Sequence, residues 1–125
     1  MSSQPARVVL IEDNDSFREM LEMVLQPIAE VVVVGSAASG DAGVALCAQL
    51  EPDVVLVDYR MPGMNGVETT RAVLAAAPRT RVICLTASVA ADEIEELRAA
   101  GAVACITKEQ KLELIVDAVC EAAAS

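Results

Sequence analysis

The sequence predicts an α/β fold in which helices cover both faces of a five-stranded parallel sheet. Five short runs rich in β-branched residues recur along the 125-residue chain, and stretches with a helical period separate them. The runs are almost continuously apolar, which is typical of parallel strands buried on both faces. The length fits a single domain, residues 1–125, and is about half of what a closed barrel of eight strand–helix units needs.

The first half of the chain holds two strand–helix units. Residues 7–11 are the first predicted strand, and apolar residues at helical spacing from Phe17 to Leu25 predict a helix that Pro27 stops. The opposite side of this helix carries Arg18, Glu19 and Glu22. A second strand is predicted at 31–35, and an Ala-rich second helix at 41–50 ends before a proline.

The second half of the chain continues the alternation. Pro78 and Gly101 mark the ends of two helices, and an apolar stripe from Leu112 to Val119 predicts the last one. Short tails at 1–6 and 122–125 are expected to be flexible. The other predicted elements are strand 53–58, helix 67–77, strand 81–86, helix 92–100 and strand 103–107.

The connections decide how the strands are arranged. Right-handed crossovers favour a doubly wound, flavodoxin-like sheet with the strand order 2-1-3-4-5. In such a sheet, ligands bind beyond the carboxyl ends of the strands, near the switch point between strands 1 and 3. Chemistry is therefore expected where these two strands end.

Charge excludes several classes of partner. The chain has a net charge of −10, and a surface of this sign repels nucleic-acid phosphates and anionic lipid. We therefore expect no direct contact with nucleic acid or membrane. The sequence shows neither a bilayer-spanning apolar run nor a secretory signal, which predicts a cytoplasmic location.

Cysteine and histidine narrow the chemistry further. The four cysteines lack the paired spacing of zinc or redox motifs and are expected to be reduced core residues. Histidine is absent, which excludes Ser-His and Cys-His nucleophile pairs and His-ligated metal sites. Acid–base or metal chemistry must therefore use carboxylates, Lys, Thr or Tyr.

Carboxylates follow the two strands that are expected to be neighbours. Glu12 and Asp13 come directly after the first strand, and Asp58 ends the third. Because adjacent strands lie about 4.8 Å apart, these groups are expected to crowd into one corner. A divalent cation that prefers oxygen ligands, Mg²⁺ or a similar ion such as Mn²⁺, would relieve their repulsion. The sequence therefore predicts an acidic pocket for a divalent ion.

Donor groups follow the other strands at the same edge. Thr86 ends the fourth strand, Ala87 comes next, and Lys108 follows the fifth. They offer a hydroxyl, an accessible backbone N–H and an ammonium group. Together with Asp58 as nucleophile, they are the groups that phosphoryl transfer requires. Taken singly, Asp58, Thr86 and Lys108 could each be an ordinary cap, turn or surface residue. Their joint placement after neighbouring strands, together with the acidic pair, is hard to explain by helix caps alone.

Four motifs carry a family resemblance that covers essentially the whole chain. They are VLIEDN at 9–14, DVVLVD at 53–58 leading into MPGMNG at 61–66, LTA at 85–87, and a Gly-Ala pair at 101–102 that precedes Lys108. The chain resembles the receiver domain of response regulators in two-component signalling. This resemblance implies that Asp58 accepts a phosphoryl group from a phosphohistidine of a partner sensor histidine kinase. The domain would then assist its own phosphorylation and dephosphorylation without being an enzyme.

The same resemblance implies roles for the other site residues. Asp13, Asp58 and the backbone carbonyl of Arg60 would hold Mg²⁺, with Glu12 acting through water. The residues implied to bind the phosphoryl oxygens are Thr86, the Ala87 N–H and Lys108.

Signal output in this family depends on a threonine that shifts and on an aromatic residue of the fifth strand. The matching positions here are Thr86 and Cys105, and a thiol is too small to gate a pocket as a ring does. Residues near Lys108 are similar to receivers that precede a LuxR-type helix-turn-helix domain, which implies transcriptional output from a longer parent chain. A stand-alone receiver is the alternative. The face formed by 92–100, 103–107 and the last helix would pair two receivers in a homodimer.

Two further positions lie beside the expected phosphoryl group. Arg60 and Ser88 follow Asp58 and Thr86 by two residues, where family members vary. We expect Arg60 to slow hydrolysis by covering the site, and a solvated arginine is the alternative.

Other functions on the same architecture fit the residues less well. A flavodoxin needs a phosphate loop and stacking aromatics, but residues 12–15 are mostly acidic and the chain has one Tyr and one Phe. An aspartate-nucleophile phosphatase would have a second carboxylate where Arg60 stands. A pseudo-receiver that binds proteins without phosphorylation stays open because of Cys105, although the acidic corner, Thr86 and Lys108 argue against it.

Overall fold

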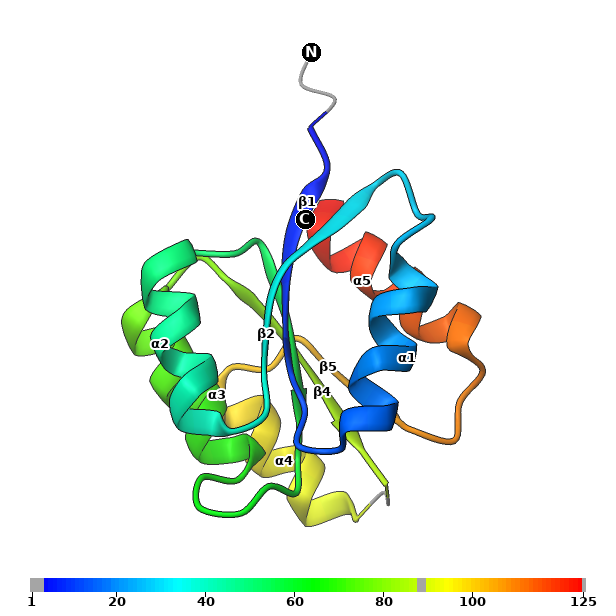
Figure 1. Ribbon diagram of the computed structural model, residues 1–125. Coiled ribbons are helices and arrows are strands. Elements are labelled where there is room, and N and C mark those ends of the chain that lie inside the picture. Colours follow the sequence, from blue (N-terminus) through cyan, green and yellow to red (C-terminus); the bar gives the residue numbers. More distant parts are fainter. Residues whose placement is uncertain (1–3, 88–89, 125) are drawn as a thin grey trace.

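Five parallel strands and five helices alternate in the computed structural model, which describes residues 4–87 and 90–124 (Figure 1). The strands pair in the order β2-β1-β3-β4-β5, so the predicted doubly wound fold is confirmed. No helix of the described chain is both long and apolar enough to cross a membrane. The elements are β1 (Ala6–Ile11), α1 (Asp15–Leu25), β2 (Val31–Ala37), α2 (Gly40–Leu50), β3 (Val54–Asp58), α3 (Gly66–Ala76), β4 (Arg81–Thr86), α4 (Ala91–Ala100), β5 (Ala104–Thr107) and α5 (Leu112–Ala124).

Two apolar layers hold the helices against the sheet. Helices α1 and α5 cover one face, and α2, α3 and α4 cover the other (Figure 1). The central strand β3 serves both layers, because side chains alternate between the faces of a strand. Val54 and Leu56 pack toward α1 and α5, whereas Val55 and Val57 pack toward the other three helices. This burial on both sides explains why the strands are continuous apolar runs.

The structure differs from the sequence prediction at several element ends, and two of these differences have a clear structural cause. Strand β2 runs to Ala37 because a bulge beside Val34 lets the next residues continue to pair with β1. Residues 122–124 were expected in a tail, but they form the end of α5, where Ala122 is buried in the core. Ala6 was also expected in a tail, but it begins β1 and pairs with Val31. Gln4 and Pro5 lie before β1, and the tail residues 1–3 and 125 lie outside the described residues.

The cysteines match their prediction in part. All four are free, as expected for reduced thiols. Cys47 and Cys84 are buried in the core, whereas Cys105 and Cys120 are only half-buried.

Candidate functional site

The carboxyl ends of β1 and β3 bring three carboxylates together, as predicted. The two strands pair in register up to Ile11 and Val57, so the residues that follow emerge at the same edge. Carboxylate oxygens of Glu12, Asp13 and Asp58 lie within 4.8 Å of one another. Glu12 and Asp58 are 1% and 4% exposed, whereas Asp13 is open to solvent. The corner thus has two buried ligand groups and one accessible one.

Lys108 provides the positive charge nearest to these carboxylates. Its Nζ lies 2.7 Å from Glu12 Oε1 and 3.1 Å from Asp58 Oδ1. Its backbone N–H donates to the Thr86 carbonyl at 2.8 Å, which ties the residues after β5 to the end of β4. The Phe17 ring, with its centroid 4.7 Å from Nζ, adds a cation–π contact. One ammonium group is therefore shared between two buried carboxylates.

The pKa of Asp58 reflects this shortage of positive charge. Burial, followed by the neighbouring Asp13 and Glu12 carboxylates, raises the pKa of Asp58 to about 7, although Lys108 acts in the opposite direction. Burial disfavours the charged form of Lys108, yet hydrogen bonds to Glu12 and Asp58 outweigh it and raise the Lys108 pKa. An additional cation in the corner would favour the ionised form of Asp58.

Local hydrogen bonds fix the loop that carries Glu12 and Asp13. The Arg18 guanidinium donates to the Glu12 carbonyl at 2.7 Å and pairs with Asp15 at 2.7 Å. The Asn14 N–H donates to Glu12 Oε2 at 3.0 Å, and the Asn14 side chain caps α1. Sequence reasoning missed Arg18, because its place opposite the apolar stripe predicted only solvent contact. Phe17 was missed as well, since the helical period explained it fully as a core residue.

A tight turn follows Asp58. The Tyr59 N–H donates to the Leu85 carbonyl at 2.8 Å, and the Gly66 N–H returns to the Tyr59 carbonyl at 2.7 Å. A Cβ atom at Gly66 would lie 2.8 Å from Tyr59 Cα, so the turn requires glycine at this position. The loop that contains Arg60 is thereby held at the edge of the acidic corner.

The predicted donors lie at the same edge. Asp58 pairs with Leu85 in the β3–β4 register, so buried Thr86 and exposed Ala87 come directly after the position beside Asp58. Ser88 lies outside the described residues. Cys105 stands beside Cys84 on the next strand and packs half-buried against the core under α2, α3 and α4. Burial raises the pKa of the Cys105 thiol.

Arg60 links the site to α4. Its side chain is 66% exposed, and its Nη2 lies 3.5 Å from Glu93 Oε1. Its guanidinium also lies 5.8 Å from the centre of the Tyr59 ring. The expected cover over Asp58 stays a prediction, since the described contacts of Arg60 are with Tyr59 and with Glu93 of α4.

Comparison with known sequences settles the family. A family model for the response regulator receiver domain matches residues 8–120. The chain belongs to this receiver family. The transcriptional regulatory protein LiaR of Bacillus subtilis is 34% identical over 113 residues, which cover 90% of this chain and 54% of LiaR. The nitrate/nitrite response regulator NarL of Escherichia coli K12 is 31% identical over 125 residues, which cover 99% of this chain and 58% of NarL.

Solved structures agree with the assignment. The signal receiver domain of a response regulator NarL from Mycobacterium tuberculosis superposes with a TM-score of 0.92 at 34% identity, and the match covers 98% of each chain. A LuxR-family response regulator from Aurantimonas gives 0.91 at 26% identity, covering 96% of this chain and 86% of the other. The receiver described here spans about half the length of the curated relatives it matches. Members of its family are phosphoaccepting signalling domains that work with sensor kinases.

Proposed function

We propose that Asp58 accepts a phosphoryl group from the phosphohistidine of a partner sensor histidine kinase. The observation that carries the proposal is the joint placement of three carboxylates within 4.8 Å and of Lys108 Nζ 3.1 Å from Asp58. An Asp58 carboxylate oxygen forms the new bond to phosphorus while the phosphorus–nitrogen bond of the donor breaks. The imidazole leaves with the electron pair of that bond.

The donor set fits a hard divalent cation such as Mg²⁺. Clustered carboxylate oxygens, with one accessible carboxylate among them, are the ligands that this ion prefers. When bound, the cation would neutralise charge on the transferring oxygens and favour ionised Asp58. The residues that would hold it are Asp13, Asp58, the backbone carbonyl of Arg60 and, through water, Glu12.

The chain's own donors complete the chemistry. Lys108 already faces Asp58, so its ammonium can pair with a phosphoryl oxygen attached there. The Thr86 hydroxyl and the Ala87 N–H, which follow the strand beside Asp58, would serve the remaining oxygens. Asp58 is 4% exposed, and this burial restricts the access of water to the acyl phosphate.

Signal output is proposed to run through β4 and β5. LiaR is a transcriptional regulatory protein, which supports control of transcription by a further domain of a longer parent chain. Phosphorylation would draw Thr86 toward Asp58 and change the packing of Cys105 on the next strand. The face formed by α4, β5 and α5 would then pair two receivers in a homodimer.

Intact mass spectrometry tests the proposal. Incubation with a small phosphodonor and Mg²⁺ should add one phosphoryl group to the wild-type chain. Neither Asp58→Asn nor a wild-type sample with chelator should gain it. An unmodified wild-type chain that is shown to be folded would refute phosphoacceptance and favour the pseudo-receiver. Addition to Asp58→Asn would assign the phosphoryl group to another residue.

A further inference from the structure

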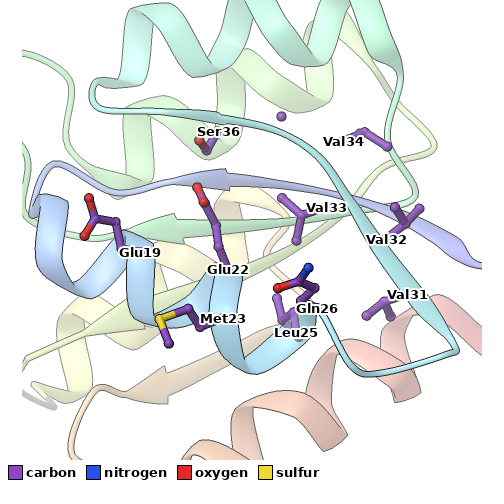
Figure 2. A pocket seen from close by; sticks show the side chains of 11 residues that line it. Glu19, Glu22, Met23, Leu25, Gln26, Val31, Val32, Val33, Val34 and Ser36 are labelled. Carbon is purple, nitrogen blue, oxygen red and sulfur yellow. The ribbon is translucent and has the colours of Figure 1, made fainter.

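A groove of about 720 Å³ lies between α1 and the edge strand β2, outside the acidic corner (Figure 2). Its apolar wall includes Leu25 from α1 and Val31 and Val33 from β2, which belong to the core under α1 and α5. Met23 lines the groove from α1 and is 72% exposed. Leu25 and Val31 are themselves buried, so the apolar surface that is accessible at this edge comes from Met23, Val32 and the half-buried Val33.

The rim of the groove is acidic. Figure 2 shows Glu19 and Glu22 projecting from α1 beside the strand. None of the ion pairs among the described residues involves Glu19 or Glu22. Within the described part of the chain, both glutamates therefore have no cationic partner. Leu25 and Gln26 bring the carbonyl end of α1 to the same groove, and the last turn of this helix has no basic residue. Two carboxylates and a helix C-terminus thus favour a cation here.

The strand that forms the other wall has a free edge. Strand β2 is the outermost strand on its side of the sheet, and alternate residues of an edge strand turn N–H and C=O groups outward. Edge strands are usually protected by charged side chains or proline, but residues 31–37 contain neither. Val32 is also 40% exposed. A bulge beside Val34 divides this edge into two short segments.

We propose that this groove binds an extended, Lys- or Arg-rich peptide segment of a partner protein. The segment adds to β2 as a sixth strand, and its backbone pairs with the free edge. Successive side chains of the added strand point to opposite faces of the sheet. The cationic ones face α1 and reach Glu19 and Glu22, while the apolar ones lie on the opposite face beside Val32 and Val34. A second copy of this chain is a poorer occupant, because each copy has a net charge of −10 and brings the same acidic rim.

The test uses the whole chain and a capped eight-residue peptide that alternates lysine and valine. Amide NMR shifts should change saturably along 31–37 and α1. The double variant Glu19→Gln/Glu22→Gln should weaken binding about fivefold, as the loss of two exposed ion pairs predicts. Glu95→Gln/Glu96→Gln removes two exposed glutamates of α4 and has the same net charge, so it should bind as tightly as the wild type. A peptide with alternate backbone nitrogens methylated should lose most of its affinity.

Several results would overturn the inference. Equal weakening by both double variants would show general charge attraction, and shifts confined to other elements would place the peptide elsewhere. Full affinity of the methylated peptide would exclude strand addition. A dimer of the chain in sedimentation that the Glu19 and Glu22 substitutions alter would make the second copy the occupant.

Discussion

The two ends of β1 and β3 differ in how their charges are satisfied. At the amino ends, the Asp53 carboxylate accepts the Arg7 N–H at 2.8 Å, and the Arg7 guanidinium donates to the Leu50 carbonyl at 2.6 Å. At the carboxyl ends, Glu12 and Asp58 share the single ammonium of Lys108. At the amino ends, the polar groups of Arg7 and Asp53 have hydrogen-bond partners within the chain. At the carboxyl ends, the negative charge of the carboxylates exceeds the positive charge of Lys108.

The proposed function explains this difference as stability given up for function. A site that is to receive a cation and a phosphoryl group needs its ligands and donors in place before either arrives. Buried and crowded carboxylates are the consequence, and burial, followed by the neighbouring Asp13 and Glu12, raises the pKa of Asp58. The amino ends have no such task, so local pairing prevails there.

The largest effect should come from removing the shared cation. Lys108→Met leaves two buried carboxylates without a counter-charge, which should lower the unfolding free energy of the metal-free protein by about 3 kcal/mol at about pH 8. Urea denaturation in chelator measures this change. Arg81→Met removes an exposed positive charge at the amino end of β4 and should cost less than about 0.5 kcal/mol. Similar losses in both variants would remove the distinction between the two ends.

The next effect has the opposite sign. The pKa of Asp58 is raised from 3.8 to about 7 by folding, so its contribution to stability is present below about pH 4 and is lost as the pH rises through 7. Asp58→Asn avoids this loss and should raise the unfolding free energy of the metal-free protein by about 2 kcal/mol at about pH 8. The gain should vanish near pH 4. Denaturation curves at several pH values check the trend, and a variant less stable than wild type at high pH contradicts it.

Removing the carboxylate at the amino end should destabilise the domain. Asp53→Ala leaves the Arg7 N–H without its side-chain acceptor, and the expected loss is about 1 kcal/mol. The same denaturation experiment measures it. A gain in stability would show that the amino end is also crowded with charge.

The smallest effect on stability is expected at Arg60. Its side chain is 66% exposed and its ion pair with Glu93 is 3.5 Å long, so Arg60→Ala should change the unfolding free energy by less than about 0.5 kcal/mol. If Arg60 shields the phosphoryl group, the same variant should shorten the lifetime of phosphorylated Asp58, as followed by intact mass. Arg71→Ala, at an exposed position of α3, is the control. An unchanged lifetime would mean that Arg60 is no shield.

Sequence reasoning was most reliable where one physical rule dominates. Continuous apolar runs between helical segments determine a doubly wound sheet, and the sheet in turn brings Glu12, Asp13 and Asp58 to one edge. The helical spacing of apolar residues could not predict that Phe17 contacts Lys108 or that Arg18 binds the Glu12 carbonyl. Both contacts depend on how α1 packs on the sheet.

Element ends were harder to predict for a related reason. The bulge that extends β2 is set by its pairing with β1, which no local pattern of residues 31–37 reveals. The last turn of α5 is alanine-rich and resembles a tail in composition, yet burial of Ala122 in the core keeps it helical. In both places tertiary contacts override the local signal.

A magnesium titration of stability tests most directly whether the carboxyl end is short of positive charge. At about pH 8, Mg²⁺ should raise the unfolding free energy of the wild-type chain by more than about 1 kcal/mol, because the ion binds only the folded state. Asp58→Asn should lose most of this response, and Asp53→Ala should keep it. A wild-type chain whose stability ignores Mg²⁺, or an equal response in Asp58→Asn, would contradict the claim.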